Sequence, residues 1–137
     1  QRAIKAPRRR NSEIFVECFI DNAKGVLSFG PDKIRYISFA IDMPLYCDCV
    51  SNASAPVIPD LGIFGSSDPV AIDKACIDAE TDAPGLPFLN KDGEWVTPME
   101  RGVEKFKALN PLCDPIHQFN AALKNKIGSI NYELSRI

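Results

Sequence analysis

The segment that decides the fold is LGIFGSSDPVAIDKACIDAE, residues 61–80, in which an apolar run passes through a small-residue turn into a helix. The apolar and glycine residues 61–65 predict a short strand. Asp68 followed by Pro69 is typical of a helix start, because a short acidic side chain caps the first free N–H groups and proline fits the first helical position. We expect this helix to run to about Glu80.

The flanking sequence adds further helices and strands to this unit. Residues 34–41 are β-branched and aromatic with little alternation, which predicts a strand covered on both faces. Amphipathic patterns and caps predict helices over about 13–23, 98–109 and 115–127, and alternation predicts a strand over 130–136. The order of these elements indicates an α/β fold, a layered sandwich of helices around a small mixed sheet.

Length and composition describe one ordinary globular domain. The chain has 137 residues, of which 45% are hydrophobic and 25% are charged, and a chain of this size can bury about two-thirds of its unfolded surface. No apolar run approaches the roughly 20 residues that a membrane-spanning helix needs, and no charged-then-apolar leader opens the sequence. We therefore expect a soluble, cytoplasmic protein without a membrane partner.

The net charge of −2 hides a basic start and an acidic body. Residues 1–10 carry five basic residues and no acidic one, so the other 127 residues hold 11 basic and 18 acidic residues. We interpret residues 1–12 as a basic linker or arm and residues 13–137 as a single α/β domain. Because the chain starts abruptly at Gln1, we expect it to be the C-terminal part of a longer protein.

The acidic residues are concentrated in the middle of the chain. Between Asp42 and Asp82 stand eight carboxylates and a single base, Lys74. Such a stretch repels phosphate backbones, which argues against nucleic acid as a partner and leaves room for cations. The alternative is a solvated acidic surface.

The five cysteines are an odd number in a chain without a secretory leader, so a disulfide framework is not expected. Cys18 falls on the apolar side of the first predicted helix and is expected to be buried. Cys47-Asp48-Cys49 follows a predicted strand, at the head of a long loop that extends to Pro59. Two thiolates two residues apart can bind one soft metal ion if the chain turns there.

Two cysteines do not complete a metal site, since tetrahedral zinc or an iron–sulfur cluster needs four ligands. Two alternatives to metal binding stay open, namely reduced cysteines packed at a strand end and a redox-active thiol pair. The candidates to complete the ligand set are Asp60, Asp68, Asp73 and Cys76.

The turn between residues 61–65 and the following helix is a second candidate site. Free N–H groups at a helix start favour anions, and Ser66 and Ser67 offer hydroxyl groups to such a ligand. Asp68 competes with this function if its carboxylate already occupies the amides as a helix cap. The alternative is therefore a plain capping turn.

The same motifs resemble a known family. Cys47-Asp48-Cys49, APVIPDLGI (residues 55–63), SDPVAIDKA (residues 67–75) and the ending IGSINYEL (residues 127–134) are similar to the C-terminal part of the domain of unknown function 362 family. The resemblance runs from about residue 13 to residue 136.

The resemblance implies an iron–sulfur context, because members of that family are described as iron–sulfur-cluster-binding or ferredoxin-like proteins of anaerobic bacteria and archaea. It implies a partner as well, the N-terminal, ferredoxin-like part of the same parent protein, whose cysteine runs this chain lacks. The matching residues are candidate site residues: Cys47, Asp48, Cys49, Asp60, Ser67, Asp68 and Asp73.

Three functional hypotheses follow. The first is a domain of an iron–sulfur-associated electron-transfer protein that contributes a metal or redox site through Cys47 and Cys49, with a cluster or a divalent metal as the cofactor. The second is a non-catalytic scaffold or interaction domain that holds the ferredoxin-like part of its parent. The third is an enzyme that binds an anionic substrate at the turn of residues 66–69. The sequence names no reaction and no oligomeric state.

Overall fold

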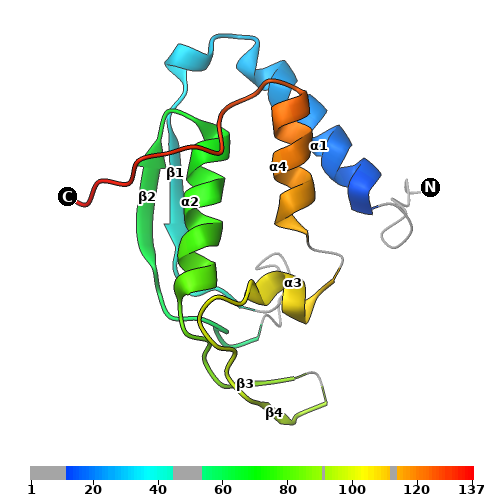
Figure 1. The fold of residues 1–137 in the computed structure, drawn as a ribbon, viewed down its shortest axis with the longest axis vertical. Helices are drawn as coiled ribbons and strands as arrows, with labels where there is room; N and C mark the ends of the chain where they lie inside the picture. The colour runs from blue at the N-terminus through cyan, green and yellow to red at the C-terminus, as the bar shows by residue number, and fades with distance from the viewer. Residues whose placement is uncertain (1–11, 45–53, 91, 112–113) are drawn as a thin grey trace, which may run out of the picture.

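The computed structural model describes residues 12–44, 54–90, 92–111 and 114–137, and they form an α/β fold of helices and short antiparallel strand pairs (Figure 1). The elements are α1 (Ser12–Leu27), the 3₁₀ helix η1 (Pro31–Lys33), β1 (Tyr36–Ala40), β2 (Gly62–Ser66), α2 (Pro69–Asp82), β3 (Phe88–Leu89), β4 (Trp95–Val96), α3 (Lys105–Leu109) and α4 (Pro115–Lys124).

The central unit is the sheet of β1 and β2 with α2 packed on one face. The strands are antiparallel, in a register that runs from the pair Tyr36 and Ser66 to the pair Ala40 and Gly62. α2 contacts both strands, and it runs back along them because β2 ends where α2 begins (Figure 1). The predicted strand, turn and helix of this unit are confirmed.

The other face of this sheet is open, so the prediction that residues 34–41 are covered on both faces is wrong. Ile37, Phe39 and Ile63 are 67%, 62% and 66% exposed, and burial along β1 alternates. The physical reason is the size of the sheet. Within the described residues the β1–β2 sheet has two strands, and both strand pairs of the fold are antiparallel. Because α2 covers one face of this narrow sheet, the other face stays exposed.

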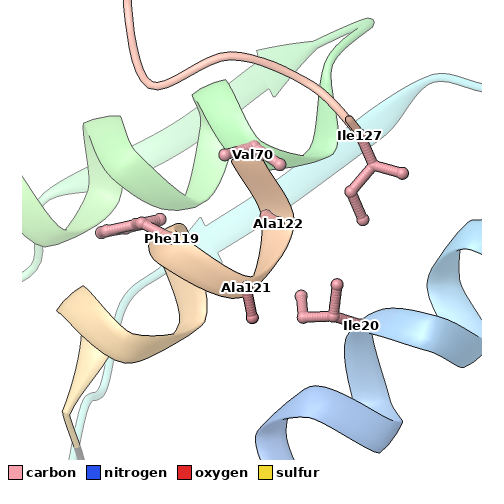
Figure 2. Close-up of a cluster of buried hydrophobic side chains, with 6 residues drawn as sticks. All are labelled: Ile20, Val70, Phe119, Ala121, Ala122 and Ile127. Atoms are coloured by element: carbon pink, nitrogen blue, oxygen red, sulfur yellow. The ribbon is translucent and has the colours of Figure 1, made fainter. Parts of the chain in front are cut away.

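The main hydrophobic core lies between α1, α2 and α4 (Figure 2). α1 contributes a stripe of residues spaced at helical intervals, Val16, Ile20, Ala23 and Leu27. Because this stripe faces the core, Cys18 lies on the exposed side, and its predicted burial is wrong. The buried members of the core are Ile20, Val70, Phe119, Ala121, Ala122 and Ile127.

A second, smaller core lies at the end of the molecule that carries β3, β4 and α3. Val57 and Ile58 are fully buried there beside Phe88, and the Leu86 N–H donates to the Val57 carbonyl over 2.7 Å. The composition around these two residues predicts an irregular loop, yet the last part of that loop carries the most deeply buried aliphatic side chains among the residues that the structure describes.

Some helices and strands begin or end at other residues than predicted, because tertiary contacts determine those ends. α1 continues past Gly25 to Leu27. The helix predicted from residue 98 begins at Lys105, where Glu104 is the N-cap. Residues 130–136 form no strand, and the tail is held instead by a 2.9 Å hydrogen bond from Tyr132 Oη to Asp78 Oδ2. Within the described residues, no helix is both long and apolar enough to cross a membrane.

A buried charged pair joins the C-terminal end of α2 to α3. Glu80 and Lys105 are 1% and 0% exposed. The Lys105 ammonium donates to the carbonyls of Glu80, Thr81 and Val103 over 3.1, 2.9 and 2.7 Å, while the Lys105 N–H donates to Glu80 Oε1 over 2.7 Å. Every charge of the pair therefore has hydrogen-bond partners, which buried charges require.

Lys105→Met tests this pair. The substitution keeps the aliphatic stem and removes the donor from three carbonyls, so we expect the free energy of unfolding to fall by about 3 kcal/mol or more. Lys107→Met is the matched control, since Lys107 forms a partly exposed ion pair with Asp114 that is worth about 1 kcal/mol or less. Urea unfolding of both variants gives the comparison, and equal losses would contradict a special role for Lys105.

Candidate functional site

The turn before α2 is closed by its own side chains. Asp68 Oδ1 accepts from the N–H groups of Val70 and Ala71 over 2.8 and 3.0 Å, and Ser66 Oγ accepts from the Asp68 N–H over 2.9 Å. Gly128 packs against the same place, where a Cβ would come within 2.3 Å of Asp68 Oδ1. The amides that an anion needs are therefore occupied. Among the three predicted ligand residues of this turn, Ser67 is exposed, whereas Ser66 and Asp68 are half-buried.

The cysteine motif lies outside the described residues, but the chain on either side of it is placed. Cys47, Asp48 and Cys49 belong to residues 45–53, which the structure does not describe. Pro44 and Pro56 form an isolated antiparallel bridge.

Asp60 lies between this bridge and β2, two residues before the strand begins. Its Oδ1 accepts from the Asp42 N–H over 2.8 Å, which ties β2 to the residues that follow β1. The chain on the two sides of the cysteine segment is thus held side by side, with the carboxylate of Asp60 bound to one side.

Asp73 lies elsewhere. It stands in the first half of α2, toward α4, where its Oδ2 accepts from Gln118 Nε2 over 2.8 Å. Because β2 and α2 run in opposite directions (Figure 1), Asp60 and Asp73 lie at opposite ends of the unit, and the structure does not bring them together. In the part of the chain that the structure describes, no three His, Cys, Asp or Glu residues gather as a metal site would require.

Cys76 is half-buried between α2 and the sheet. Burial raises the pKa of the Cys76 thiol, a hydrogen bond with the Ser38 side chain partly offsets this, and the negative charge of Asp73 raises the pKa further. The thiol therefore stays protonated at neutral pH, which makes it a poor nucleophile and a poor metal ligand.

Glu80 and Lys105 are the charged residues that the sequence did not single out as a pair. Burial raises the pKa of the Glu80 carboxyl group, and the hydrogen bond from the Lys105 backbone lowers it in part. The ammonium of Lys105 is saturated by three carbonyls, so it is not free to act as a nucleophile. Their 25-residue separation leaves no periodic signal in the sequence.

The geometry defines a small α/β domain. A family model with the description "Domain of unknown function (DUF362)" matches residues 2–78, which is more than half of the chain. The chain therefore belongs to the DUF362 family. The matched range includes β1, β2 and most of α2, and it ends before the C-terminal motif of the resemblance. No curated protein and no solved structure matches the chain.

The two described cysteines should differ in reactivity. Cys18 is exposed, whereas Cys76 is half-buried with a raised thiol pKa. We expect iodoacetamide at pH 7.5 to alkylate Cys76 at least about tenfold more slowly than Cys18. Timed quenching followed by peptide mass spectrometry measures both rates in one sample. Equal rates in the native protein would show that Cys76 is accessible and activated.

Proposed function

We propose that this chain is an assembly domain of a DUF362 protein, which holds the ferredoxin-like part of its parent through the open face and edges of the β1–β2 sheet. The observation that carries the proposal is the exposed apolar face opposite α2.

The open face is apolar at neighbouring positions. Phe39 and Ile63 are direct cross-strand partners, and Ile37 lies two residues along β1 on the same face, opposite Gly65. All three side chains are more than 60% exposed. Burying each of them fully would contribute at most about 1.5 to 3 kcal/mol, which favours a partner laid on this face.

The edges of the same sheet support the proposal. Among the described residues, β1 pairs with β2 and with no other strand, so each strand has an outer edge whose backbone groups are not in a ladder. Isolated two-stranded sheets are marginal in water, and open edges readily accept further strands. A partner strand would therefore satisfy hydrogen bonds at the edge and extend the apolar face with its own side chains.

The ferredoxin-like part is the occupant that the family context favours. The family resemblance implies that such a part precedes this region in the parent. The acidic body of this chain and its closed turn favour a protein partner over a phosphate-bearing one.

Lysine substitutions on the open face test the docking. We expect residues 34–41 to exchange amide hydrogens at least about tenfold more slowly in the full-length parent than in the isolated chain. Ile37→Lys/Phe39→Lys should abolish this protection in the parent, because buried lysines are costly. Hydrogen exchange with mass spectrometry measures both effects.

Phe29→Lys is the matched control, since Phe29 is 84% exposed and lies outside the sheet. It should leave the protection intact, and circular dichroism should show the same helix content in every variant. If residues 34–41 exchange equally in the parent and in the isolated chain, no partner covers the sheet, and the assembly function is wrong.

A second function is favoured by a separate observation. We propose that Cys47 and Cys49 contribute a metal or redox site, as an iron–sulfur cluster or a divalent metal in the full-length parent. The bridge between Pro44 and Pro56 supports this, since it holds both ends of the cysteine segment together. Asp60 lies near that bridge, where its Oδ1 accepts from the Asp42 N–H, and we expect its carboxylate to join the two thiolates in the ligand set.

Metal analysis of the anaerobically purified parent tests this site. We expect the double variant Cys47→Ala/Cys49→Ala to contain about one equivalent less iron or zinc per site than the wild type, because a soft metal loses half of a four-ligand set. Cys18→Ala serves as the control, since Cys18 is exposed on α1, and it should retain the metal. Unchanged metal in the double variant would eliminate the metal function and leave the assembly function standing.

A further inference from the structure

A small cavity remains in the main core where α1, α2 and α4 meet. It has a volume of about 60 Å³. Its inner wall is apolar and includes Val70, Ala122 and Ile127, members of the cluster in Figure 2. Phe19 of α1, 58% exposed, forms one side of the opening.

Two polar side chains line this cavity, and because Asp73 is exposed and Gln118 half-buried, we place both at its opening. Asp73 of α2 and Gln118 of α4 are joined by the 2.8 Å hydrogen bond from Gln118 Nε2 to Asp73 Oδ2. None of the ion pairs among the described residues includes Asp73. The cavity is therefore an apolar space with one uncompensated carboxylate at its mouth.

The electrostatics of Asp73 favour a cation. The residue keeps one side in solvent, but apolar neighbours take water from its carboxylate. This desolvation raises the pKa of Asp73, and the hydrogen bond from Gln118 offsets it in part. A positive charge placed beside the carboxylate would favour its ionised form and reverse the effect.

The size and lining of the cavity limit what can enter. A water molecule needs about 10–15 Å³ of such volume and two to four polar partners, so 60 Å³ accommodates a chain of about four heavy atoms. Apart from Asp73 and Gln118, the lining residues carry no polar side chain that would hold water. An aliphatic chain would instead fill the void and restore the dispersion contacts that its walls lack.

We propose that this cavity binds a short primary alkylamine, with the aliphatic chain between the three helices and the ammonium group on Asp73. The orientation of the bound amine follows from the position of Asp73 at the opening of the cavity. A lysine side chain of another protein carries its ammonium at the far end and would place that charge against the apolar inner wall, so a free amine fits and a lysine residue does not. This site is independent of the open sheet face.

Titration of the ¹⁵N-labelled chain with n-butylammonium chloride tests the proposal. We expect saturable shifts of amides on α1, α2 and α4 around the cavity, with a dissociation constant in the millimolar range, as a ligand of this size allows. Sodium chloride at equal ionic strength, 1-butanol and Nα-acetyl-lysine methylamide are the comparison ligands. Each of these comparison ligands should need at least a tenfold higher concentration than n-butylammonium to saturate the shifts of the same amides.

Two variants locate the ligand. Asp73→Asn keeps the shape of the side chain and removes its charge, so it should weaken binding at least tenfold. Ala23→Leu adds bulk to a half-buried residue that lines the cavity, and it should abolish binding even if Asp73→Asn proves unstable. Asp21→Asn changes an exposed acidic residue on α1, the helix that carries Ala23, and it should leave binding unchanged.

The possible outcomes of these titrations have different meanings. Equal binding of 1-butanol and n-butylammonium, unaffected by Asp73→Asn, would mean an apolar cavity with no preference for amines and would overturn the proposal. The absence of saturable shifts would mean a packing void alone, with the same consequence. Binding of the lysine derivative at the strength of the free amine would contradict the inferred orientation.

Discussion

The structure depends on α2, because both the β1–β2 sheet and α4 pack against this helix. One side of α2 covers the β1–β2 sheet, and another side contributes Val70 to the core shared with α1 and α4. Its first amides are capped by Asp68, and the carbonyls at its C-terminal end receive the buried ammonium of Lys105. Both ends of the helix are thus saturated by other parts of the chain, which fixes its length and its position on the sheet.

A single helix on a two-stranded sheet leaves the opposite face in water. This arrangement explains why Ile37, Phe39 and Ile63 are exposed although their residue types are typical of a protein interior. The molecule combines a well-satisfied helical layer with an incomplete sheet, and contiguous apolar surface of this kind marks an interaction site. Membership of the DUF362 family sets the context of that surface without assigning it a reaction.

The candidate site was predictable from the sequence to the extent that it is local. Asp68 and Pro69 identify the helix start by their chemistry, and the family motifs identified the family. Whether Asp60 and Asp73 belong to one site depends on the directions of β2 and α2, which spacing cannot give. Segments that meet only in the folded chain produce the contact of Glu80 with Lys105 and the cavity beside Asp73. Neither feature can therefore be predicted from a periodic pattern in the sequence.

The sequence by itself determined the α/β class, the start of α2 at Asp68 and the helix that follows Asp114. Each of these rests on interactions between residues a few positions apart, which propensity and capping describe. The tertiary structure decided which face of α1 is buried, which face of β1 is open, where α3 begins, and that Val57 and Ile58 form a core. Those outcomes depend on which distant segments compete for the same apolar surface, and the hydrophobic effect acts on total buried area rather than on sequence order.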